Sequence, residues 1–316
     1  MIRELFKCEF GKICYAGWEW LVMRIAFCIL LWPATFHNWS LMPQNIRDSV
    51  DQEQGNGLAG LFNLEWIGAS PMEWIAQYLF LGFLIVYATG KWQLFASAGL
   101  LVLHSLIGGI FASPAKDHHA TQVVGIALLG QFLWFSWEFL RTKKAFANCC
   151  GNGGEQALDR STGAIFFSQQ GIAAAYVVSA ISKWVNSGGG IIPGAKWIAQ
   201  TQNIPVQMEK NNLQAFYDHL QMPENAELNQ RSIDFVINSP NIAMIFFATA
   251  FYLEFLAIFA IWNRKISALF GIGLICMHLG IAAVMHLQFW YFEAIVLVFF
   301  VNIPFWAKKF GTKQQG

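Results

Sequence analysis

Long uninterrupted apolar runs restrict what this chain can fold into more than any other feature. Several runs are about 18 residues or longer, which is enough for a helix to cross the hydrocarbon core of a bilayer. Of the 316 residues, 56% are hydrophobic and 12% are charged, whereas a soluble domain carries roughly 25% charged residues. The runs are continuous rather than alternating, which argues against a transmembrane β-barrel. We therefore predict an all-α fold, a polytopic helical membrane bundle with about eight transmembrane helices and an outer helical cap.

The predicted spans belong to one integral-membrane domain, residues 1–316, and are separated by polar or glycine-containing connections. They cover about 18–36, 73–89, 92–111, 121–140, 162–184, 242–262, 266–285 and 289–306. The longest polar stretch, 186–241, contains aromatic residues and short amphipathic pieces. We expect it to form an ordered outer cap with helices over the membrane face, rather than a disordered linker. In the third span, Gly108 and Gly109 would allow close contact between helices.

The charges favour a multi-pass protein with both termini in the cytoplasm. With eight crossings, most of the 20 Lys and Arg residues fall in cytoplasmic segments, as the positive-inside rule predicts. The formal net charge of +1 gives no electrostatic reason to expect a nucleic-acid partner. No cysteine falls in a predicted outward loop, so we predict no structural disulfide. We predict no metal site either, since the adjacent Cys149 and Cys150 lack zinc-ligand spacing.

A polar stripe on the fifth span is the first candidate for a functional site. Going back from Lys183, the residues Ser179, Tyr176 and Gln169 follow at i−4, i−7 and i−14 on one helical face. We expect this face to meet other helices or a cavity rather than lipid. A lysine among apolar walls has its ammonium form disfavoured, which suits a general base. The alternative is a lysine that only snorkels to the membrane surface.

Histidines gather near the predicted outer side, the same side as Lys183. His118 and His119 begin the fourth span, and His278 and His286 lie near the end of the seventh. We expect these groups to line a pocket under the cap, with the active face outward, in the periplasm or a lumen. The simpler alternative is that each histidine is only an interfacial residue.

Several of these residues resemble the vitamin K-dependent γ-carboxylase membrane domain and its bacterial relatives, the HTTM proteins. The pattern Tyr176…Ser182-Lys183-Trp184 follows a span, and Glu254 and His278 lie in later spans. The run His119-Ala-Thr-Gln-Val-Val-Gly-Ile-Ala-Leu-Leu is similar to the family's histidine-led helix. The resemblance extends over residues 18–306.

The resemblance implies an enzyme in which Lys183 is the base that deprotonates a reduced naphthoquinone, a vitamin K-type quinol. The quinol would react with oxygen to give a stronger base, which removes a γ-proton from glutamate before carbon dioxide adds. His119, or His118 one residue earlier, would support Lys183 by hydrogen bonding. The implied partners are membrane lipid, a lipid quinone, and a peptide or protein substrate on the outer face. The remaining candidates for the quinone pocket are Tyr176, Ser179, His278, Glu254 and His286.

Two features differ from the family. The chain ends soon after its last predicted span, whereas the animal enzyme carries a large lumenal region that helps to bind a propeptide. Ser182 stands where the family often has a basic residue. We therefore do not expect propeptide-directed capture of a protein substrate, even where the quinol chemistry is kept.

Two other classes of function remain open. A non-catalytic membrane protein would use the cap, 186–241, to dock a binding or assembly partner, and Lys183 would then be replaceable. A transporter would need a water path to the inner face, where only Glu138 and Glu254 are candidates, so we rank it last.

Overall fold

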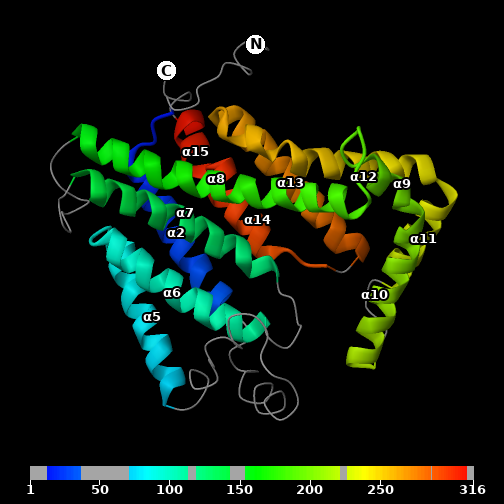
Figure 1. Cartoon of the computed structure of the whole chain (residues 1–316), viewed down its shortest axis with the longest axis horizontal. Helices are drawn as coiled ribbons and strands as arrows, with labels where there is room; N and C mark the ends of the chain where they lie inside the picture. The colour runs from blue at the N-terminus through cyan, green and yellow to red at the C-terminus, as the bar shows by residue number, and fades with distance from the viewer. Residues whose placement is uncertain are drawn as a thin grey trace.

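The structure is a bundle of helices (Figure 1). This computed structural model describes residues 13–36, 71–112, 119–142, 154–220, 226–285 and 287–311. All regular secondary structure within these ranges is helical. The predicted all-α class is therefore confirmed for the described part of the chain.

Several helices are apolar and long enough to cross a membrane. Among the described residues, four qualify singly: Gly17–Phe36, Thr121–Arg141, Arg160–Asn186 and Arg264–Ala283. Two bent pairs raise the number to six: Ala226–Asn238 with Pro240–Phe255, bent by 104°, and Trp290–Val301 with Ile303–Phe310, bent by 46°. These helices support a membrane protein, while the eight crossings, the orientation of the termini and the outward face stay predictions.

The first half of the bundle follows the predicted spans closely. Its helices are α2 (Gly17–Phe36), α5 (Met72–Thr89), α6 (Gln93–Ala112), α7 (His119–Thr142) and α8 (Gly154–Asn186). Helix α8 begins before the apolar run, and Arg160, in its second turn, forms an ion pair with Glu138 of α7.

The second half contains breaks that the apolar runs do not reveal. Its elements are α9 (Ala195–Ala199), η3 (Gln200–Asn203), α10 (Ile204–His219), α11 (Ala226–Asn238), α12 (Pro240–Phe255), η4 (Ala257–Ile261), α13 (Arg264–Met285), α14 (Trp290–Val296), η5 (Leu297–Val301) and α15 (Ile303–Gly311). The predicted sixth span divides into α12 and the 3-10 helix η4. The predicted eighth span passes through the π-helical η5 and then breaks at Asn302, which has a left-handed backbone with φ of 52°.

Close packing of α7 against α8 forms the most extensive helix contact in the described structure. A Cβ atom on Gly130 of α7 would lie 2.4 Å from the carbonyl oxygen of Phe167, so only glycine allows the two backbones to approach this closely. By contrast, a Cβ on Gly108 would have nothing within 4 Å. Gly108 therefore makes no close helix contact among the described residues, whereas the predicted role of Gly109 stays a prediction.

The described residues within the stretch 186–241 form the helices α9, α10 and α11 and the 3-10 helix η3, with a small apolar core of their own. Helices α10 and α11 pack against each other, with Met208, Ile233, Val236 and Ala243 buried between them and the start of α12. In Figure 1 these two helices run across the direction of α8, beside its C-terminal end. This arrangement is compatible with a cap, and its outward position stays a prediction.

Candidate functional site

An ion pair joins the ends of α8 and α12. The Lys183 ammonium donates to the Glu254 carboxylate, and the Ser179 hydroxyl donates to the same oxygen, Oε2, at 3.4 Å. The Glu254 side chain is only 8% exposed and that of Lys183 is 30% exposed. Ser179 and Lys183 are one turn apart on α8, so both can reach one carboxylate. The structure thus brings three of the predicted site residues together.

Trp197 of α9 covers the lysine from a third side. Its ring centroid lies 5.3 Å from Lys183 Nζ, within the range of a cation–π contact. The ring packs against Phe247 and Phe251 of α12, each with centroids 6.0 Å away. Gly194 starts α9 with φ of 76°, and a Cβ there would lie 2.4 Å from Phe251, so glycine lets α9 pack against α12. The sequence prediction did not include Trp197 among the site residues.

A hydrogen bond between Tyr176 and His278 lies next along the same face of α8. The Tyr176 hydroxyl and His278 Nε2 are 2.9 Å apart, and which group donates depends on the imidazole tautomer. The rings of Phe289 and Phe292 pack around His278, with centroids at 4.8 and 5.4 Å. His278 Nδ1 is buried and has no hydrogen-bond partner among the described residues. This nitrogen is therefore available to a ligand or a water molecule.

Gln169, the last member of the predicted stripe, belongs to a different polar network. Its Nε2 donates to the Tyr15 hydroxyl at 3.0 Å and to the Phe299 carbonyl at 2.7 Å. Burial raises the pKa of Tyr15 to about 12, so its hydroxyl stays protonated and donates to Gln169 Oε1 at 3.2 Å. The stripe therefore serves two separate clusters along α8.

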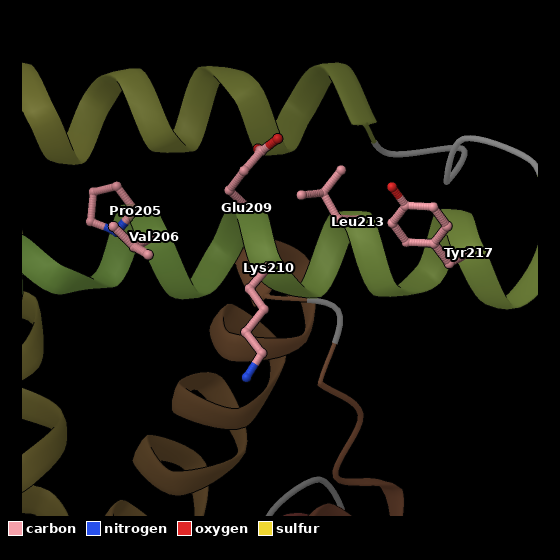
Figure 2. A pocket seen from close by; sticks show the side chains of 6 residues that line it. All are labelled: Pro205, Val206, Glu209, Lys210, Leu213 and Tyr217. Atoms are coloured by element: carbon pink, nitrogen blue, oxygen red, sulfur yellow. The ribbon is translucent and has the colours of Figure 1, made fainter.

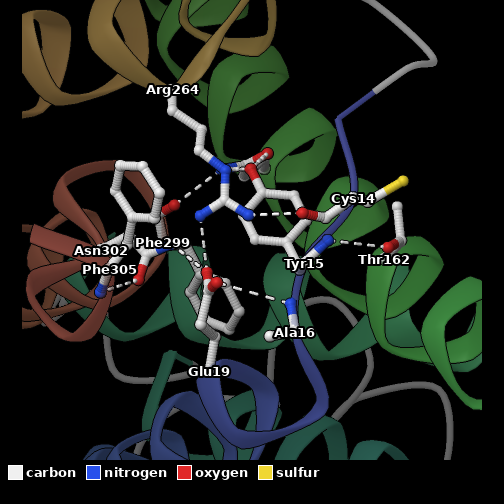
Figure 3. A network of polar contacts seen from close by, with 10 residues as sticks. Cys14, Tyr15, Ala16, Glu19, Thr162, Arg264, Phe299, Asn302 and Phe305 are labelled. Carbon is white, nitrogen blue, oxygen red and sulfur yellow. Dashed lines mark hydrogen bonds and ion pairs between the residues drawn. The ribbon is translucent and has the colours of Figure 1, made fainter. Parts of the chain in front are cut away.

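The second cluster is organised around Arg264 at the start of α13 (Figure 3). Its guanidinium binds the buried Glu19 carboxylate at 2.6 Å and the Cys14 carbonyl at 2.5 Å. Asn302 donates to the same Glu19 oxygen, Oε2, at 2.9 Å. The guanidinium also lies over the rings of Tyr15 and Phe305, 4.3 and 4.2 Å from their centroids. This cluster connects the chain before α2 to α13 and α15, and we interpret its role as structural.

The remaining predicted site residues do not join the cluster within the described structure. His119 is the first residue of α7, and its side chain lies outside the described part. His118 and His286 also lie outside the described residues, as do Cys149 and Cys150. Among the side chains that are described, no three His, Cys, Asp or Glu residues form a group that could hold a metal ion. The supporting role predicted for His119 therefore stays a prediction.

Electrostatics at Lys183 differ from the predicted surroundings. The sequence predicts an amine among apolar walls, whereas the structure places a carboxylate against it. The carboxylate compensates part of the cost of burying the Lys183 ammonium. For Lys183 to act as a base, its proton would first have to move, and Glu254 is the neighbouring acceptor.

Comparisons with known proteins identify no relative of this chain. No family model matches the sequence, and neither a curated protein nor a solved structure matches it significantly. The resemblance to the γ-carboxylases and HTTM proteins therefore stays a hypothesis, and the geometry of the site carries the functional argument.

Proposed function

We propose that the chain is a membrane-embedded enzyme with γ-carboxylase-like chemistry, in which Lys183 acts as a base toward a reduced lipid quinone. One observation carries the proposal: along one face of α8, the ion pair between Lys183 and Glu254 of α12 lies next to the hydrogen bond between Tyr176 and His278 of α13. Ionisable groups inside such a bundle are rare and usually functional. In this proposal both termini are cytoplasmic and the site is near the outer side.

A planar quinol ring fits the residues at the site. His278 Nδ1 is buried without a partner among the described residues and would receive or donate a hydrogen bond at a ring oxygen. The aromatic rings of Trp197, Phe289 and Phe292 would contact its faces or edges. When bound, the quinol would supply the reaction with oxygen that yields a strong base. The apolar helix surfaces would hold its lipid tail.

The chain's own residues would handle the first proton in two steps. The Lys183 ammonium passes its proton to the Glu254 carboxylate, which leaves a neutral amine beside a neutral acid. That amine then accepts the hydroxyl proton of the bound quinol. Ser179 holds the Glu254 side chain in place through its hydrogen bond. Carboxylation of a glutamate side chain, with carbon dioxide and oxygen as co-substrates, is the overall reaction that the resemblance implies.

Oxygen uptake by the purified protein in lipid nanodiscs tests the proposal. With reduced menaquinone or vitamin K quinol supplied, Lys183→Ala is expected to abolish quinol-dependent oxygen uptake. Lys196→Ala is the matched control, because Lys196 is exposed on α9 and, within the described part of the chain, donates only to the Gly188 carbonyl; it is expected to keep full activity. Full activity in Lys183→Ala would overturn the proposal. Stoichiometric quinone in the purified protein, measured by mass spectrometry, would support it independently.

A second candidate function is a non-catalytic membrane protein that docks a binding or assembly partner on residues 186–241. The ion pair itself favours this reading, since it satisfies Lys183 within the protein and joins α8 to α12. Replacing Lys183 and Glu254 together by apolar residues would then leave partner capture intact. Substitutions on the polar face of α11, such as Arg231→Glu, would instead abolish it.

A further inference from the structure

Helix α10 has two apolar faces, and only one of them is covered within the described structure. Met208 is fully buried against α11, while Val206, Leu213 and Tyr217 are 72%, 46% and 70% exposed. The separations of seven and four residues place these three exposed side chains on one face of the helix. An exposed apolar stripe of this kind marks an interaction surface.

The exposed stripe forms an open groove of about 760 Å³ with an almost wholly apolar lining (Figure 2). It is lined by Pro205, Val206, Glu209, Lys210, Leu213 and Tyr217. Lys210 has a long apolar stem with a charged end, and Tyr217 has an apolar ring with a polar hydroxyl. Both residue types are favoured where acyl chains meet headgroups, because each can satisfy both environments.

The partner helix α11 carries exposed charges on its outer face. Its inner face buries Ile233 and Val236, and its outer face carries the exposed ion pair between Glu227 and Arg231. Leu228 and Phe235 are 49% and 44% exposed beside this ion pair, so the outer face of α11 combines charged and apolar side chains. An apolar stripe on α10 and exposed charges on α11 fit a hairpin that lies between lipid and water, with α10 on the lipid side.

The connection to α12 places this hairpin at a membrane boundary. Only Ser239 separates α11 from α12, and the two helices are bent by 104°. If α12 crosses the membrane, its first residue lies at the surface, and α11 then runs nearly parallel to that surface. The first turns of α12 expose Ile242, Ile245 and Phe246, so the apolar surface continues from the hairpin onto the candidate span.

We propose that α10 lies in the headgroup–acyl boundary of one lipid leaflet. Val206 and Leu213 insert between acyl chains, Tyr217 lies at the carbonyl level, and the Lys210 ammonium binds lipid phosphate. The hairpin thus anchors residues 186–241 to the bilayer. This role requires neither the quinol chemistry nor a protein partner.

Photo-crosslinking in nanodiscs of phosphatidylcholine and phosphatidylglycerol tests the proposal. Benzoylphenylalanine is incorporated in place of Val206, Leu213 or Tyr217, and in place of Arg231 as the control on the polar face. The three α10 positions are expected to yield phospholipid adducts by mass spectrometry, at least tenfold above the Arg231 position. Equal lipid adducts at Arg231, or crosslinks from the α10 positions to a second copy of the chain, would overturn it. Three separate α10 positions keep the test decisive where one variant does not fold.

Discussion

The Lys183 ammonium and the Glu254 carboxylate form an ion pair that links the C-terminal ends of α8 and α12. Trp197 lies over the same ammonium, and the Ser179 hydroxyl shares the same carboxylate oxygen. Two helices, α8 and α12, and the short helix α9 thus meet at these two opposite charges. The energetic role of this pair can be measured apart from any catalytic role.

Removing one member of the pair is expected to destabilise the protein. Lys183→Met leaves the buried Glu254 carboxylate without its cation and should cost about 1–3 kcal/mol of unfolding free energy. The double variant Lys183→Met with Glu254→Gln should cost less than the sum of the two single variants, because no charge is then left unpaired. Reversible unfolding by SDS in mixed micelles measures all four proteins. Strictly additive costs would show that the two side chains do not interact.

Arg264 is expected to contribute more to stability than Lys183, because its guanidinium has more partners. Arg264→Gln leaves the Glu19 carboxylate unpaired and should cost about 3–5 kcal/mol. Arg264→Lys keeps the charge but loses the bond to the Cys14 carbonyl and the flat contacts with two rings, so it should recover only part of that loss. The same unfolding measurement compares the two variants. Equal stability of Arg264→Lys and the unchanged protein would exclude a special role for the guanidinium.

Periodicity within one helix is the part of the site that the sequence predicts well. Tyr176, Ser179 and Lys183 lie on one face because a helix repeats every 3.6 residues, and the structure has all three facing other helices. The residues that these three side chains contact on other helices cannot be read from the periodicity of one helix. Glu254 and His278 were selected as polar residues in later spans, and the contacts that they make depend on how α12 and α13 pack.

Contacts between distant segments are the part that the sequence does not reveal. Glu19 and Arg264 are 245 residues apart, and each has the appearance of an ordinary charge near the end of an apolar run. Trp197 resembles any interfacial tryptophan until α9 folds against α12. The break at Asn302 did have a signal: Pro304 follows two residues later, and a proline at that position favours the first turn of a new helix.

The two glycine positions in neighbouring helices give a matched test of α7–α8 packing. Gly130→Ala places a methyl group 2.4 Å from the Phe167 carbonyl oxygen, so the helices have to separate, at a cost of about 1–3 kcal/mol. Gly108→Ala adds a methyl group where nothing lies within 4 Å, and should gain up to about 1 kcal/mol from helix propensity. Thermal unfolding of the two variants in nanodiscs should move in opposite directions. Equal shifts would show that α7 and α8 do not approach this closely.

The Tyr176–His278 pair allows the structural and binding roles of the site to be separated. Tyr176→Phe leaves His278 Nε2 as a buried polar atom without a partner, which should cost about 1–3 kcal/mol. Adding His278→Leu removes the imidazole as well, so the double variant should be more stable than Tyr176→Phe alone. Both effects follow from the 2.9 Å hydrogen bond and need no ligand. Unfolding curves of the two variants test the structural role of the Tyr176–His278 hydrogen bond.

Quinone binding by the same variants tests the binding role of His278. His278 Nδ1 is the buried nitrogen that we assign to a ring oxygen of the bound quinone. The double variant Tyr176→Phe with His278→Leu is therefore expected to fold but to lose most of its bound quinone. It should retain less than a tenth of the quinone that co-purifies with the unchanged protein. The reason is that one lost hydrogen bond of about 1.4 kcal/mol corresponds to a tenfold change in affinity. Tyr176→Phe alone keeps Nδ1 and should retain most of it. If the stable double variant held quinone as well as the unchanged protein does, His278 would be a packing residue only.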